Sequence, residues 1–95
     1  MQDKEEEDKI AFMTCVELVL MKRGDTKHNL VMAKLKSLYD ADIMDCFEHP
    51  EYLRTVLKQV FKDEYTAVLN EVKLELEKLV DIDRLKTKFF RVMED

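Results

Sequence analysis

Apolar residues recur every three or four positions along most of this chain, which is the spacing of one face of an amphipathic helix. The segment 50–61 shows it most clearly, with apolar positions at Leu53, Val56, Leu57, Val60 and Phe61. The segment 65–79 repeats it at Tyr65, Val68, Leu69, Val72, Leu76 and Leu79. The segment 82–93 repeats it at Ile82, Leu85, Phe89, Val92 and Met93. The sequence therefore predicts an all-α fold with these faces turned inward.

The helix boundaries follow from residues that start or stop helices. Pro50 suits a first helical position, where its missing N–H needs no partner, and Gly24 suits the end of a helix. Asp25, Asp63 and Asp81 each precede a periodic segment and are expected to cap its first turn. We expect a compact bundle of about five helices over 5–23, 26–39, 50–61, 65–79 and 82–93.

The first helix differs from the others because its apolar residues are not confined to one side. Every residue from 10 to 21 is apolar except Thr14 and Glu17. A helix that is apolar on all sides is buried on all sides, in a core or in a subunit interface. We expect the excess to form an interaction surface made of Phe12, Met13, Val16 and Leu20.

Two further segments complete this reading. In the second helix, we expect Val31, Leu35, Leu38 and Tyr39 to face the core. The segment 40–49 breaks the periodicity and is expected to be a loop with one short turn, from which Ile43, Met44 or Phe47 points inward.

Composition limits the chain to a single domain over residues 1–95, and the order of the acidic start at 1–4 stays open. One glycine and one proline are too few for the turns of a β-fold. The net charge of −5 disfavours nucleic acid as a partner. The stretch 10–21 is too short to cross a bilayer. Two cysteines and an acidic start without a leader pattern favour a reducing cytoplasm.

Few residues offer catalytic or ligand-binding chemistry. Cys46 and His49 lie three positions apart, but Asp45 and Glu48 surround them with negative charge, which raises a thiol pKa. A zinc site usually shows two such close pairs, so a metal or redox site at Cys15, Cys46 and His49 is kept only as an alternative. Glycine-rich phosphate loops are absent, and we expect no enzyme activity and no cofactor.

A second alternative is a DNA-binding regulator. Arg54, Lys58 and Lys62 follow one another at four-residue spacing and would form a basic row along the helix 50–61. In an acidic domain, the simpler interpretation is that these side chains form the solvent-exposed polar face of an amphipathic helix and make it soluble.

One block of the sequence resembles a known family. The run Asp45-Cys46-Phe47-Glu48-His49-Pro50-Glu51-Tyr52-Leu53, followed by Val56-Leu57 and Val60-Phe61, is similar to the Nitrosopumilus output domain family of ammonia-oxidising archaea. The most specific positions are Asp45, Cys46, His49, Pro50 and Tyr52. The resemblance implies an archaeal cytoplasmic domain associated with signal transduction. One departure is that Lys62-Asp63 stand just after Val60-Phe61, where the family pattern leads us to expect a glycine.

These observations together predict a non-enzymatic helical interaction module. It would act through an unknown protein partner or as a homodimer, because the first helix carries more apolar surface than a core of this size needs.

Overall fold

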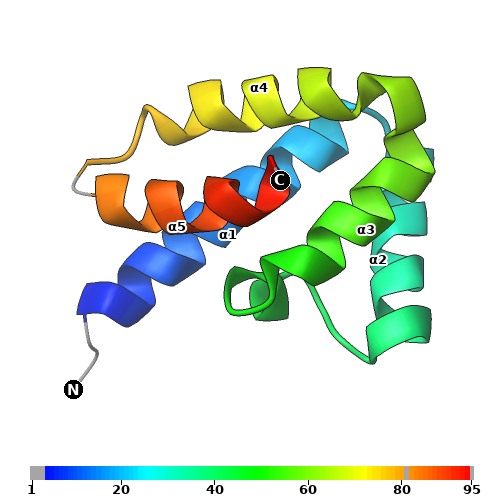
Figure 1. Cartoon of the computed structure of the whole chain (residues 1–95), viewed down its shortest axis with the longest axis horizontal. Coiled ribbons are helices and arrows are strands. Elements are labelled where there is room, and N and C mark those ends of the chain that lie inside the picture. Colours follow the sequence, from blue (N-terminus) through cyan, green and yellow to red (C-terminus); the bar gives the residue numbers. More distant parts are fainter. Residues whose placement is uncertain (1–3, 81, 95) are drawn as a thin grey trace.

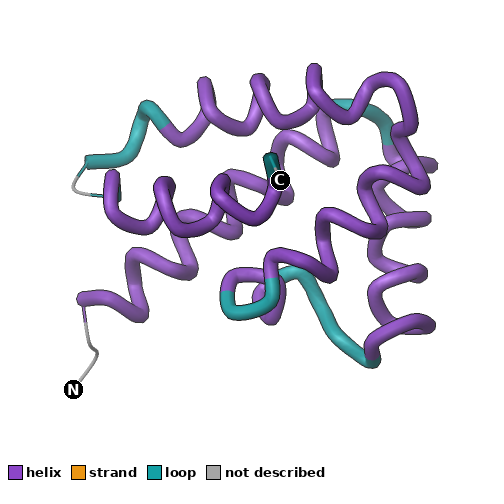
Figure 2. The backbone as a smooth tube through the Cα atoms, viewed as in Figure 1, coloured by secondary structure: helices purple, strands orange, loops and turns teal. Residues whose placement is uncertain are grey.

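The computed structural model describes residues 4–80 and 82–94, and all regular elements in these ranges are helices (Figure 2). The α-helices are α1 (Lys4–Lys22), α2 (Asp25–Tyr39), α3 (Pro50–Phe61), α4 (Tyr65–Leu76) and α5 (Asp83–Met93). Two short 3₁₀ elements, η1 (Met44–Phe47) and η2 (Lys62–Glu64), lie between them. The predicted all-α class is confirmed. Since η2 joins α3 to α4 without a loop, the described residues form four long continuous helical segments instead of five separate ones.

The helices pack in two pairs that share one core. α1 packs against α4, and α2 packs against α3 (Figure 1). After the connection at 77–82, α5 runs back along α4 and also packs against α3. Phe12 of α1 lies at the centre, with its ring centroid 5.5 Å from that of Phe47 and 5.0 Å from that of Phe89. A residue of α1 therefore joins η1 and α5 in one aromatic cluster.

The predicted core faces are largely confirmed. All five apolar positions predicted for α3 are buried, as are Ile82, Leu85, Phe89 and Met93 in the last segment. In α2, Val31 and Leu35 are buried, but Leu38 is 52% exposed, so its place in the core is wrong. Leu38 lies near the end of α2, where the stacked rings of Tyr39 and Tyr52 make the contact with α3 instead.

Within the single chain, the expectation that α1 is buried on all sides is wrong, while burial of its remaining side in a subunit interface stays a prediction. Ile10, Leu18 and Met21 are 46%, 39% and 47% exposed. The predicted interaction surface is wrong for the opposite reason, since Phe12, Met13, Val16 and Leu20 are all fully buried within the single chain. The remaining helices of so short a chain cover most sides of α1 but leave one side open. The excess apolar surface lies on that open side.

Two of the three predicted helix caps, at Asp25 and Asp63, are wrong. Asp25 is the first residue of α2, and Gly24 holds the cap position without a side-chain hydrogen bond. Asp63 lies inside η2, and the cap position of α4 belongs to Glu64. Asp81 falls outside the described residues, as do residues 1–3 of the acidic start, while Lys4 begins α1. Gly24 does follow the end of α1 with a positive φ of 123°, as expected of a residue that ends a helix.

Candidate functional site

The block that resembles a family is built around two aspartates that hold η1 in place. The Asp42 N–H donates to the Asp45 carboxylate at 3.0 Å, and the Asp45 N–H donates to the Asp42 carboxylate at 3.2 Å. This reciprocal pair satisfies two N–H groups at the start of a short helical turn, as in a capping box. Asp45 therefore has the structural role that its side chain allows in the sequence, which is to bond a main-chain N–H beside a helical turn.

Cys46 lies in the core beneath this turn. It is fully buried, and its thiol donates to the main-chain carbonyl of Asp42 at 3.6 Å. Burial, together with the negative charge of Asp45, raises the pKa of the Cys46 thiol to about 12. The sequence predicted the direction of this shift from charge, and the structure adds burial as the larger cause. A thiol held neutral in this way is a poor nucleophile and a poor metal ligand.

His49 and Tyr52 continue the block with a stack of flat rings. The ring centroids of His49 and Tyr52 lie 4.7 Å apart. Tyr52 in turn stacks on Tyr39, with ring centroids 4.1 Å apart. Pro50 is buried at the first position of α3. Cys15, on α1, is only partly buried. The described residues contain no group of three potential metal ligands, so Cys15 does not join Cys46 and His49 in a metal site. The alternative of a metal site at Cys15, Cys46 and His49 is therefore wrong for the described part of the chain.

The first candidate site is the open side of α1. Ile10, Thr14, Leu18 and Met21 recur at spacings of four, four and three residues, which places them in one line along the helix. We call this line the α1 stripe. All four are exposed, and three are large apolar residues. At 1.5 Å per residue, the stripe extends over roughly 16 Å.

The α1 stripe leads into a groove between α1 and η1, which we call the η1 groove. Its volume is about 230 Å³, and its lining residues are Glu6, Lys9, Ile10, Met44, Asp45, Phe47 and Glu48. The apolar part comes from Ile10, Met44 and Phe47. Three carboxylates and one ammonium group stand around it. The ammonium belongs to Lys9, which is paired with Glu48 at 2.8 Å and lies over the Phe47 ring.

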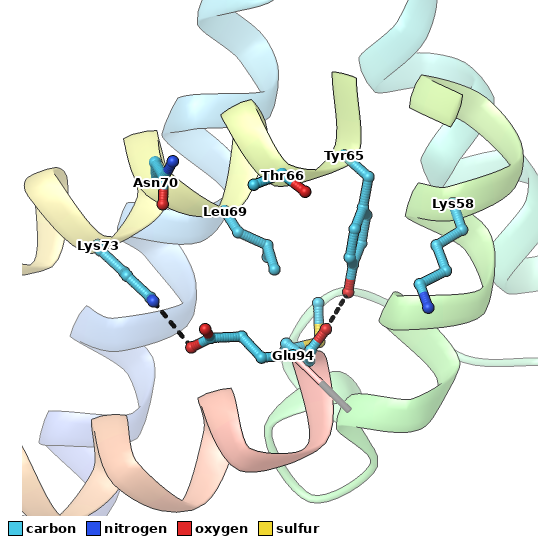
Figure 3. A pocket seen from close by; sticks show the side chains of 8 residues that line it. Lys58, Tyr65, Thr66, Leu69, Asn70, Lys73 and Glu94 are labelled. Carbon is cyan, nitrogen blue, oxygen red and sulfur yellow. Dashed lines mark hydrogen bonds and ion pairs between the residues drawn. The ribbon is translucent and has the colours of Figure 1, made fainter. Parts of the chain in front are cut away.

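A second cleft of about 370 Å³ lies between α3, α4 and the end of α5 (Figure 3). We call it the α5 cleft. Its lining residues are Lys58, Tyr65, Thr66, Leu69, Asn70, Lys73, Met93 and Glu94. The Tyr65 hydroxyl donates to the Met93 carbonyl at 2.6 Å, and Lys73 pairs with Glu94 at 2.8 Å. Figure 3 shows Lys58 and Lys73 at opposite ends of the cleft, with Leu69 pointing into it.

The basic row predicted for DNA binding is not one free face. Arg54 is half-buried and donates to the main-chain carbonyl of Val92 at 3.4 Å, at the end of α5. The Lys58 ammonium lies 5.3 Å from the centre of the Tyr65 ring, in the α5 cleft. Lys62 lies beyond the end of α3 in η2. The three basic side chains therefore do not follow one free face of α3 as predicted, and a DNA contact through them stays a prediction.

Comparison of the chain with protein-family models, curated proteins and solved structures finds no match. Within the described residues, none of the helices is both long enough and apolar enough to cross a membrane.

Sequence reasoning missed both sites, for different reasons. The α1 stripe had a signal, because Thr14 and Glu17, the polar residues of the segment 10–21, mark the side that faces water. The α5 cleft had none. Its residues are spread over more than a third of the chain, with Lys58 on α3, Tyr65 and Lys73 on α4, and Glu94 just after α5. Only the packing of these helices brings them together.

Proposed function

We propose that this chain is a non-enzymatic interaction module that binds a basic amphipathic segment of a partner protein through the α1 stripe and the η1 groove. The observation that carries the proposal is the combination of exposed Ile10, Leu18 and Met21 with an acidic rim. Scattered surface leucines need no explanation, but a line of large apolar side chains beside a groove is typical of a docking surface.

The charges around the groove favour a basic partner over a second copy of this chain. Glu6, Asp45 and Glu48 surround the groove, and Lys9 neutralises only one of them. A lysine or arginine side chain fits this chemistry, because its hydrocarbon stem can lie on Met44 and Phe47 while its cationic head reaches the carboxylates. A second copy would bring another net charge of −5, which opposes self-association.

The geometry of the stripe supports a helical partner. The apolar side chains of Ile10, Leu18 and Met21, eight and three residues apart, lie on one side of α1 and can contact the apolar face of an amphipathic helix lying alongside. The family resemblance around Asp45 and His49 supports a place in archaeal cytoplasmic signal transduction, with this docking surface as the output. This assignment to a family and a cell compartment is part of the proposal.

A pair of synthetic helical peptides tests the proposal. Both have about 18 residues with leucine on one face, and the other face is lysine in one and glutamate in the other. Fluorescence anisotropy is expected to show binding of the lysine peptide and no binding of the glutamate peptide. Leu18→Ser is expected to weaken binding about fivefold, because the Leu18 side chain loses the apolar area it buries against the peptide.

Leu74→Ser is the matched control, because Leu74 is an exposed leucine on α4, whereas the stripe lies on α1. This variant is expected to bind as tightly as the unaltered chain. Equal binding of both peptides, or equal loss with Leu18→Ser and Leu74→Ser, would overturn the proposal. Sedimentation equilibrium could instead show a dimer that Leu18→Ser dissociates. That result would mean that the partner is a second copy of this chain and not a basic segment of another protein.

A further inference from the structure

We infer that the α5 cleft is a second binding site, for a small organic carboxylate with an apolar body, and that Glu94 competes with this ligand. The inference is independent of the proposed function, because the cleft shares no residue with the α1 stripe or the η1 groove.

The structure shows a carboxylate already held in this cleft. The Glu94 carboxylate lies 2.8 Å from the Lys73 ammonium, and Figure 3 shows the pair at the lower left edge of the cleft. Lys73 also lies over the Phe90 ring at 5.2 Å, which helps to fix its position. Of the two ammonium groups in the cleft, the one on Lys73 is therefore already paired with a carboxylate of the chain itself.

The second cationic group is left for a ligand. Within residues 4–80 and 82–94, the contact found for the Lys58 ammonium is with the Tyr65 ring, and no carboxylate lies within 4.0 Å of it. A carboxylate that binds Lys58 gains an ion pair without breaking one. If the ligand also displaces Glu94, it reaches Lys73 as well.

The rest of the lining matches an organic anion better than an inorganic one. The hydrocarbon stems of Lys58 and Lys73 flank the edge of Leu69, which is 5% exposed, while Met93 behind it is fully buried. Thr66 and Asn70 add polar groups along the α4 edge. The volume of about 370 Å³ is at the lower end of the range for small-molecule sites. A carboxylate attached to a short hydrocarbon can lay that hydrocarbon along the lysine stems while it pairs with an ammonium group, and a free phosphate cannot, so the site favours the organic anion.

The test is an NMR titration of the full chain labelled with ¹⁵N, using hexanoate, adipate and inorganic phosphate as three separate probes. Hexanoate and adipate are expected to shift the amide signals of Thr66, Leu69 and Asn70 in a saturable manner. Phosphate is expected to cause smaller shifts that do not saturate in the same range. The absence of saturable shifts with both carboxylates, or equal binding of phosphate, would overturn the inference.

Two variants with opposite expected effects make the test sharper. Lys58→Gln removes the available cation and is expected to weaken hexanoate binding about threefold, the size of one exposed ion pair. Glu94→Gln removes the competing carboxylate and is expected to strengthen binding by a similar factor. Lys36→Gln, on α2, is the matched control for loss of one positive charge and is expected to have no effect.

A general effect of net charge would change binding equally in Lys58→Gln and Lys36→Gln, and that result would overturn the inference. Unchanged binding in Glu94→Gln would do the same, because the competition would then be absent. The dispersion of the amide signals in each variant checks that the chain is still folded.

Discussion

The Tyr65 hydroxyl donates a hydrogen bond of 2.6 Å to the main-chain carbonyl of Met93 and thereby joins the first turn of α4 to the last turn of α5. The last carbonyls of a helix have no partner within the helix. Arg54 of α3 does the same for the carbonyl of Val92 at 3.4 Å. Two side chains from different helices thus donate to the last carbonyls of α5. The contact between Tyr65 and Met93 also forms part of the α5 cleft.

Tyr65→Phe is expected to destabilise the fold by about 1–2 kcal/mol, because the Met93 carbonyl loses its partner in a buried setting. Urea unfolding followed by circular dichroism measures the change. A loss below a few tenths of a kcal/mol would contradict the role given to this bond.

The same variant carries a pH signature. Burial raises the pKa of Tyr65 from its ordinary 10.0 to about 12, so the folded state holds this proton more tightly than the unfolded state. The contribution of the protonated Tyr65 hydroxyl to the free energy of unfolding is complete below pH 10. It is lost as the pH rises from 10 to about 12. Tyr65→Phe is expected to lose less stability than the unaltered chain over that range.

Lys62→Gly is expected to stabilise the chain by about 1 kcal/mol. Lys62 ends α3 with φ 51° and ψ −116°, a conformation that glycine adopts easily and that a side chain disfavours. The glycine expected from the family resemblance at this position would relieve the strain. Thermal and urea unfolding measure the effect.

The control for this substitution is Ala33→Gly, in the interior of α2, which is expected to cost about 0.5–1 kcal/mol. If both variants lose stability, the strain assigned to Lys62 is contradicted.

The Cys46 thiol is expected to react with thiol reagents only when the chain unfolds. It is fully buried, and its pKa of about 12 leaves almost no thiolate near neutral pH. A Cys15→Ser variant isolates Cys46, and a Cys46→Ser variant isolates the partly exposed Cys15. Timed labelling at pH 7.5 is expected to modify Cys15 well before Cys46. Rapid labelling of Cys46 in the folded chain would contradict its place in the core.

Part of the site was visible in the sequence, and part was not. The block around Asp45 and Pro50 predicted a turn followed by a helix start, and η1 and α3 follow that pattern. The stripe on α1 was misplaced, because Thr14 and Glu17 are the only polar residues of the segment 10–21 and two positions give a weak signal for its outer side. The helix caps were also misplaced, because Asp25 and Asp63 lie one position away from the cap positions that the structure shows.

By itself, the sequence determined that the chain is helical and which faces of α3, α4 and most of α5 are buried. These properties depend on residues within a few turns of one another, and the spacing of apolar side chains reports them directly. The tertiary structure alone decided which side of α1 stays open and that Lys58, Lys73 and Glu94 meet in one cleft. Those outcomes depend on how separate helices pack around a shared core, and the local periodicity of each helix carries no information about that arrangement.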